Sequence, residues 1–86
     1  ELGLLNRVVP AGEALDGALA LARSIVANGP LAVATSKRVM RDSASWSDAE
    51  LWPRQNAATA AIFDSEDARE GAAAFAEKRA PVWKGR

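Results

Sequence analysis

The stretch SEDAREGAAAFAEKRAPVWKGR, residues 65–86, carries the clearest helix signals in the chain. Ser65 is a good N-cap, because its hydroxyl can accept a hydrogen bond from a free backbone N–H of the first turn. Glu66 and Asp67 place negative charge where the helix dipole favours it, and Pro81 cannot continue a helix. The pattern predicts a helix that begins after Ser65 and ends before Pro81. Its expected packing stripe consists of Ala68, Ala72, Phe75 and Ala76.

Three further helices are expected upstream of this stretch. The first spans about residues 13–27, where apolar residues recur at helical spacing. The second spans about 31–43 and follows the turn Asn28-Gly29-Pro30, which ends the first helix. The third begins at Ser47 with the capping box Ser47–Glu50. Because Pro53 lies deep in this third helix, we expect a kink or a restart there.

The N-terminal run Leu4–Val9 is β-prone and closed by Pro10. A lone strand has no ladder partner within its own chain, so we expect it to pair with a sheet that lies outside this sequence. The expected fold is therefore all-α, with three to four helices and a short N-terminal strand or extended segment.

Composition limits how large a core the chain can build. Nonpolar residues make up 49% of the 86 positions, but 20 of them are alanine, whose methyl group buries little area. Gly71 lies in the middle of the last helix at a cost of about 1 kcal/mol relative to alanine, which indicates close contact with another backbone or a ligand. We expect the chain to need a partner surface.

Charge and residue usage exclude several functions. The formal net charge is zero, which argues against nucleic-acid binding through a basic surface. A basic cluster, Lys37, Arg38 and Arg41, could hold a phosphate or form a DNA-reading helix after the first turn, but a solvated helix face explains these residues as well.

The sequence has no His and no Cys, so neither a His-based serine triad nor a common zinc site is expected. A carboxylate cluster, a candidate acid–base group, consists of Asp64, Glu66, Asp67 and Glu70.

The first residue is Glu1 and the single methionine is Met40, so we expect a segment of a longer protein. No signal-peptide pattern and no apolar run of about 20 residues is found. We therefore expect no membrane partner and a cytoplasmic location.

Three blocks of the sequence resemble the enoyl-CoA hydratase/isomerase (crotonase) family in the same order. They are residues 3–10, residues 28–37 and, most specifically, residues 65–86 with the run Ala-Phe-Ala-Glu-Lys-Arg at 74–79. The resemblance covers essentially the whole chain. It is not specific for one reaction within the family.

The resemblance implies that residues 1–10 end the family's core and that residues 11–86 form a C-terminal helical domain. Such a domain drives assembly into a trimer or a dimer of trimers and covers the acyl-CoA site. The implied parent is a lyase that hydrates 2-enoyl-CoA, with its catalytic glutamates and oxyanion hole upstream and no cofactor beyond the coenzyme A of its substrate. No catalytic residue is expected here, and the isolated segment is expected to be inactive. An isomerase or another acyl-CoA enzyme, and a non-catalytic assembly module, remain alternatives.

The resemblance also implies two binding residues. In the Ala-Phe-x-Glu-Lys-Arg motif, the Phe and Lys reach the adenosine and phosphate part of CoA from the neighbouring subunit. They correspond to Phe75 and Lys78. The alternative is core packing for Phe75 and a favourable interaction with the helix dipole for Lys78. Trp52 and Ile62 are weaker candidates for contact with the acyl tail.

Overall fold

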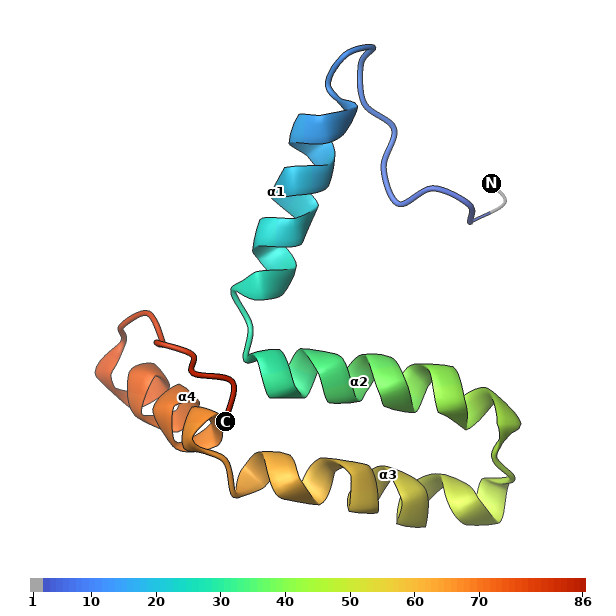
Figure 1. Ribbon diagram of the computed structural model, residues 1–86, viewed down its shortest axis with the longest axis vertical. Coiled ribbons are helices and arrows are strands. Elements are labelled where there is room, and N and C mark those ends of the chain that lie inside the picture. Colours follow the sequence, from blue (N-terminus) through green and yellow to red (C-terminus); the bar gives the residue numbers. More distant parts are fainter. Residues whose placement is uncertain (1–2) are drawn as a thin grey trace.

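The computed structural model describes residues 3–86, in which four α-helices follow one another (Figure 1). No strand is found within these residues, so the all-α fold is confirmed and Leu4–Val9 is an extended segment. The first two residues of the expected 1–10 core segment lie outside the described part. The helices are α1 (Ala14–Val26), α2 (Pro30–Asp42), α3 (Asp48–Phe63) and α4 (Glu66–Glu77), with a short 3-10 turn, η1 (Ser43–Ser45), between α2 and α3.

The predicted caps form at the start of α3 and α4. The Ser47 backbone N–H donates to the Glu50 carboxylate at 3.0 Å, as a capping box requires. At the start of α4, the Ser65 hydroxyl accepts from the Ala68 N–H at 3.0 Å. The expected restart at Pro53 is wrong, because α3 runs through that residue without a break. The cap and the packing of α3 on its neighbours outweigh the single backbone hydrogen bond that proline removes.

The helices form a thin, open arrangement (Figure 1). Helices α2 and α3 lie antiparallel side by side, and α4 contacts α3. Helix α1 stands away from the other three, since the chain bends by 104° between α1 and the following helix. The N-terminal segment folds back along α1, and the C-terminal residues run back along α4.

The chain buries very little of its own apolar surface. Its radius of gyration is 16.6 Å, against about 12 Å for a compact domain of this length. Its accessible surface is 7072 Å², against about 4,900 Å² for a compact protein of 9.1 kDa. Ala74 is the single buried hydrophobic residue among those described. The expectation that the helices need an additional surface agrees with these dimensions.

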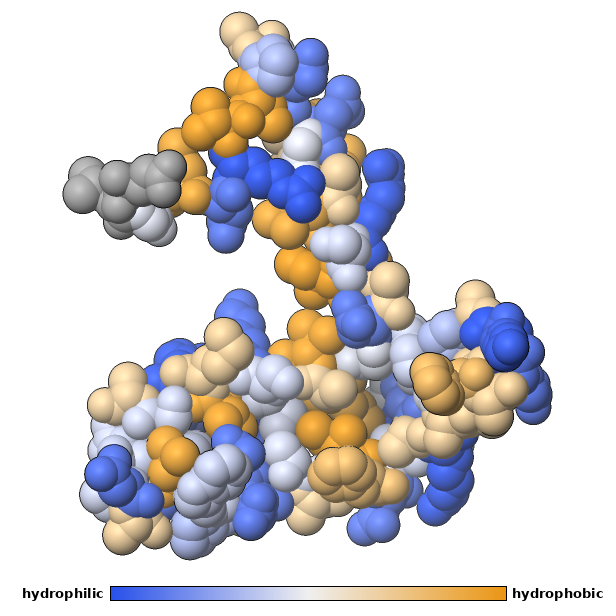
Figure 2. All heavy atoms as spheres, turned by 180° about the vertical axis from the view of Figure 1, so that it is seen from behind, coloured by the Kyte–Doolittle hydropathy of each residue, from blue (hydrophilic) through white to orange (hydrophobic). Residues whose placement is uncertain are grey.

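Two predicted packing stripes face outward. On α1, Leu15 and Val26 are about 70% exposed, and Figure 2 shows apolar surface along α1 and the N-terminal segment. On α4, the stripe through Phe75 is wrong, because Phe75 is 88% exposed while Asp67 and Ala74 are buried. Helical spacing identifies an apolar face, but the elements available to pack decide which face is covered.

Within the described part of the chain, no single helix is long and apolar enough to cross a membrane. The bent pair Ala14–Val26 and Pro30–Ser45 meets the length and composition criteria only when its two helices are taken together.

Candidate functional site

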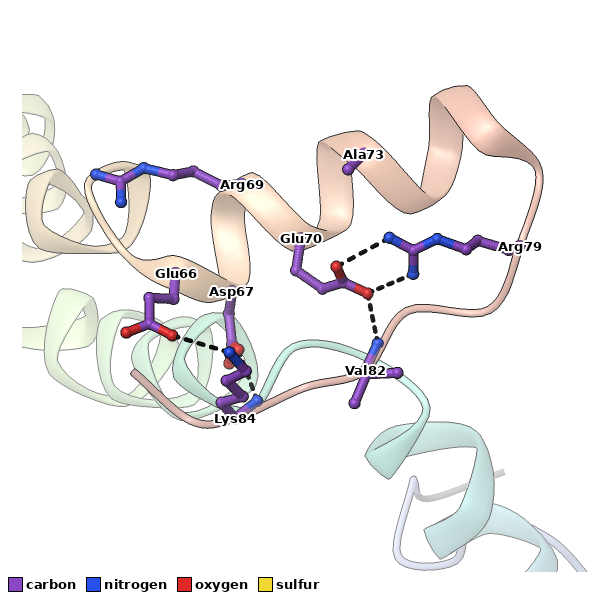
Figure 3. Close-up of a pocket in the computed structure, with 8 residues that line it drawn as sticks. All are labelled: Glu66, Asp67, Arg69, Glu70, Ala73, Arg79, Val82 and Lys84. Carbon is purple, nitrogen blue, oxygen red and sulfur yellow. Dashed lines mark hydrogen bonds and ion pairs between the residues drawn. The ribbon is translucent and has the colours of Figure 1, made fainter.

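The C-terminal tail, residues 80–86, is held against α4 by two carboxylates of that helix (Figure 3). Asp67 is 5% exposed, and its two oxygens accept from the backbone N–H groups of Lys84 and Gly85 at 2.7 and 2.9 Å. Glu70 accepts from the Val82 N–H at 2.7 Å. These contacts pair the backbone amides of a segment that has no secondary structure of its own.

The acidic cluster expected from the sequence is therefore mostly engaged in structure. Glu66 pairs with Lys84 at 3.2 Å and with Arg86 at 3.3 Å, and these cations lower its pKa. The pKa of Glu70 falls to about 2, first because Arg79 donates to it and then because the Val82 N–H does. A carboxylate held ionised in this way is a poor general acid near neutral pH. The open cavity beside these residues, about 460 Å³, is lined by these bound carboxylates and by Arg69, whose guanidinium donates to the Asp64 carbonyl.

Trp83 connects the tail to the turn between α1 and α2. Its indole Nε1–H donates to the Ala27 carbonyl at 2.9 Å. Its ring packs over Gly29 and Gly71, so closely that a Cβ at Gly71 would lie 3.1 Å from the Cη2 of Trp83. A close contact does exist at Gly71, but the predicted partner, another backbone or a ligand, is wrong, because the neighbour is an aromatic side chain of the same chain.

Arg79 forms a charged latch with two glutamates of α4, defined here as Glu70, Glu77 and Arg79. The two terminal guanidinium nitrogens contact the two Glu70 oxygens at 2.6 and 3.0 Å. The Nε donates to Glu77 at 2.6 Å. A bidentate pair of this kind fixes the orientation of both side chains, and the two carboxylates raise the pKa of Arg79.

Lys78 lies just beyond the end of α4 rather than in its last turn. Its φ and ψ are 54° and 41°, the left-handed conformation, which no other non-glycine residue of 3–86 adopts. The Lys78 N–H donates to the Phe75 carbonyl at 3.3 Å and the Arg79 N–H to the Ala74 carbonyl at 3.0 Å. This is the Schellman arrangement, in which glycine is the usual left-handed residue. Within residues 3–86, the Lys78 ammonium makes no ion pair.

Phe75 and Lys78 are both on the surface. Phe75 is 88% exposed, so core packing within this chain does not explain it. Trp52, the weaker candidate on α3, is 63% exposed, whereas Ile62 is half-buried in a hollow that it lines with Gly71 and Trp83. The structure thus leaves an aromatic ring exposed in the last turn of α4 and a cation exposed just beyond it.

Sequence reasoning missed the contacts of Asp67, Glu70 and Trp83 that hold the tail. Local rules assign the two acidic residues to the first half of a helix and see no role for the tryptophan. The sequence did contain one signal, because Gly71 in mid-helix indicated a close contact, although the expected partner was another backbone or a ligand. That signal does not identify the partner.

Comparison with known proteins finds matches to one protein family. The sequence profile described as Enoyl-CoA hydratase/isomerase matches residues 1–86. The enoyl-CoA hydratase EchA19 of Mycobacterium tuberculosis is 45% identical over 86 residues, which is 100% of this chain and 32% of that protein. The carnitinyl-CoA dehydratase of Salmonella arizonae is 45% identical over 87 residues, which is 96% of this chain and 33% of that protein.

Solved structures agree with these sequence matches. A probable enoyl-CoA hydratase/isomerase from Mycobacterium abscessus superposes with a TM-score of 0.95 at 58% identity, over 98% of this chain and 33% of its own. An enoyl-CoA hydratase from M. tuberculosis H37Rv superposes with a TM-score of 0.96 at 48% identity, over 99% and 34%. The chain spans about a third of the length of these relatives.

Proposed function

The chain belongs to the enoyl-CoA hydratase/isomerase family, and on that premise we propose that it is the C-terminal helical segment of an enzyme that hydrates 2-enoyl-CoA. In this proposal the segment has two tasks. It assembles subunits into a trimer or a dimer of trimers, and it contributes Phe75 and Lys78 to the CoA site of a neighbouring subunit. Residues 1–10 end the catalytic core, and residues 11–86 form the helical domain.

The exposure of Phe75 beside an unpaired Lys78 is the observation that carries the CoA-binding part of the proposal. An exposed aromatic face can stack on adenine, since every base presents a π-face. An ammonium with no carboxylate partner in the described chain is available to a phosphate. Phe75 lies in the last turn of α4 and Lys78 follows directly after the helix end, so in this proposal one nucleotide contacts both.

The assembly part of the proposal rests on surface area. The chain exposes roughly 2,200 Å² more than a compact protein of its mass, which is the scale of a permanent subunit interface. Apolar residues on α1 and α3 contribute to it, among them Leu15, Val26 and Phe63. Sister subunits and the rest of the parent enzyme would cover this surface.

The chemistry of the proposed parent would lie outside this chain. Hydration needs backbone donors that stabilise the thioester enolate and glutamates that handle water and its proton. The Asp and Glu residues of α4 are committed to the tail and to Arg79, so we expect no hydratase activity from this segment alone. A related isomerase or another acyl-CoA reaction is the alternative, and the cytoplasmic location stays a prediction.

Titration of the full-length parent with CoA tests the proposal. Phe75→Ala and Lys78→Ala should each weaken CoA binding about tenfold, the effect of losing one stacking or one charged contact. Met40→Ala and Arg23→Ala are the controls, because they remove an exposed apolar side chain and an exposed cation from other helices. If the α4 variants bind CoA like the controls while the oligomer persists, the CoA role is refuted. The non-catalytic assembly module would then be the better description.

A further inference from the structure

We infer that Glu70 and Arg79 are positioning residues that hold Lys78 in its binding conformation, an inference that rests on the proposed function of Lys78. Neither side chain needs to touch CoA. Glu70 holds Arg79, and Arg79 in turn holds Glu77, so the residues before and after Lys78 are joined by the latch.

The first step of the reasoning is geometric. Lys78 lies between Glu77 and Arg79 in sequence, and these two neighbours are joined directly by the 2.6 Å contact from the Arg79 Nε. The same guanidinium reaches back to Glu70 on α4 with two further contacts, as Figure 3 shows. The backbone of Lys78 is therefore enclosed in a short loop whose ends are tied to each other and to the helix.

The second step concerns the conformation of Lys78. A side chain with a Cβ adopts the left-handed region only where the surroundings hold it there. Glycine would do so freely but would carry no ammonium group. The latch supplies the constraint that allows a lysine to occupy this position, and thereby fixes where its side chain leaves the backbone.

The third step concerns charge. Glu77 is adjacent to Lys78, and an unpaired carboxylate there would compete with an anionic ligand for the ammonium. Arg79 pairs with both Glu77 and Glu70, so neither carboxylate pairs with the Lys78 ammonium, which remains available to an anionic ligand. The pKa of Glu70, lowered to about 2 by Arg79, keeps the latch ionised throughout the neutral range.

CoA binding by the full-length parent, with steady-state kinetics, provides the test. Arg79→Lys keeps the charge but cannot form the bidentate pair, and Glu70→Gln keeps an acceptor for the Val82 N–H. Each should raise the Kd of CoA about fivefold, because the binding conformation of Lys78 becomes a minor one. The change should fall on KM rather than kcat, since the CoA handle is remote from the reacting bond. Arg54→Lys is the control, because Arg54 also pairs with a glutamate of its own helix, Glu50 on α3, through a single contact, and this variant should leave CoA binding unchanged.

The same variants in a Lys78→Ala background separate the possible outcomes. If the latch acts through Lys78, Arg79→Lys has no further effect once the ammonium is gone. An equal loss in both backgrounds would mean that the latch is merely structural and would overturn the inference. A loss for Lys78→Ala with none for Arg79→Lys and Glu70→Gln would overturn it too. No loss for Lys78→Ala would instead refute the proposed function itself.

Discussion

Replacing Gly71 by alanine should destabilise α4, although alanine is the better helix former. Helix propensity alone would stabilise the helix by about 1 kcal/mol. The new Cβ, however, would lie 3.1 Å from the Cη2 and 3.4 Å from the Cζ3 of Trp83, well inside ordinary carbon contact at about 3.5–4.0 Å. The ring is restrained by the bond from its Nε1–H to the Ala27 carbonyl, and it also packs on Gly29.

The expected magnitude follows from these two opposing terms. Overpacking against a fixed neighbour costs about 1–3 kcal/mol, so the net destabilisation is about 1 kcal/mol, with a range of about 0–2. If Trp83 is first replaced by leucine, the steric term is removed and the sign reverses. Gly71→Ala should then stabilise α4 by about 1 kcal/mol.

Hydrogen exchange of the α4 amides in the full-length protein measures these local free energies. Ala72→Gly, an exposed position on the same helix, is the control, because it reports the propensity term without the tryptophan. If Gly71→Ala stabilises α4 to the same extent in the presence of Trp83 and in the Trp83→Leu background, the packing of the ring does not explain the glycine at position 71.

Three further outcomes are expected. Asp67→Asn should loosen the tail by about 1–3 kcal/mol, because the N–H of either Lys84 or Gly85 would then face the NH₂ group of the new side chain. The control Asp48→Asn, in the first turn of α3, should leave the tail unchanged, and exchange rates of the tail amides report both outcomes. Protonation of Glu70, whose pKa is lowered to about 2, should release the Val82 amide only as the pH falls from about 4.5 through 2, so protection that is already lost at pH 6 would contradict the assignment. Pro53→Ala should stabilise α3 by about 1–3 kcal/mol because it restores a backbone donor, and an unchanged or faster exchange in α3 would show that the proline is not a cost there.

Local sequence signals predicted the helices well. The capping box at Ser47, the N-cap at Ser65 and the Asn28-Gly29-Pro30 turn all appear where the sequence places them, because each depends on residues within one helical turn. The same rules failed for the face of α4. Spacing alone put Phe75 in a packing stripe, whereas the ring is exposed and the buried face contains a carboxylate.

The candidate site shows the same division. The resemblance to a family indicated Phe75 and Lys78, and the structure leaves both on the surface, but it does not test their binding role. No local rule predicts that Lys78 takes a left-handed conformation, which glycine would normally occupy. Beside it, Arg79 contacts Glu70, nine residues earlier, and Glu77, the contacts that we infer hold this conformation.

The sequence by itself determined where the helices begin, the lack of imidazole and thiol chemistry, and the family. These properties follow from composition and from interactions between residues a few positions apart. Only the tertiary structure decided which faces are covered, what Gly71 accommodates, and how the tail returns to α4 through Asp67, Glu70 and Trp83. The reason is physical: these contacts join residues 9 to 56 positions apart, and such contacts form only when the whole chain brings the partners together.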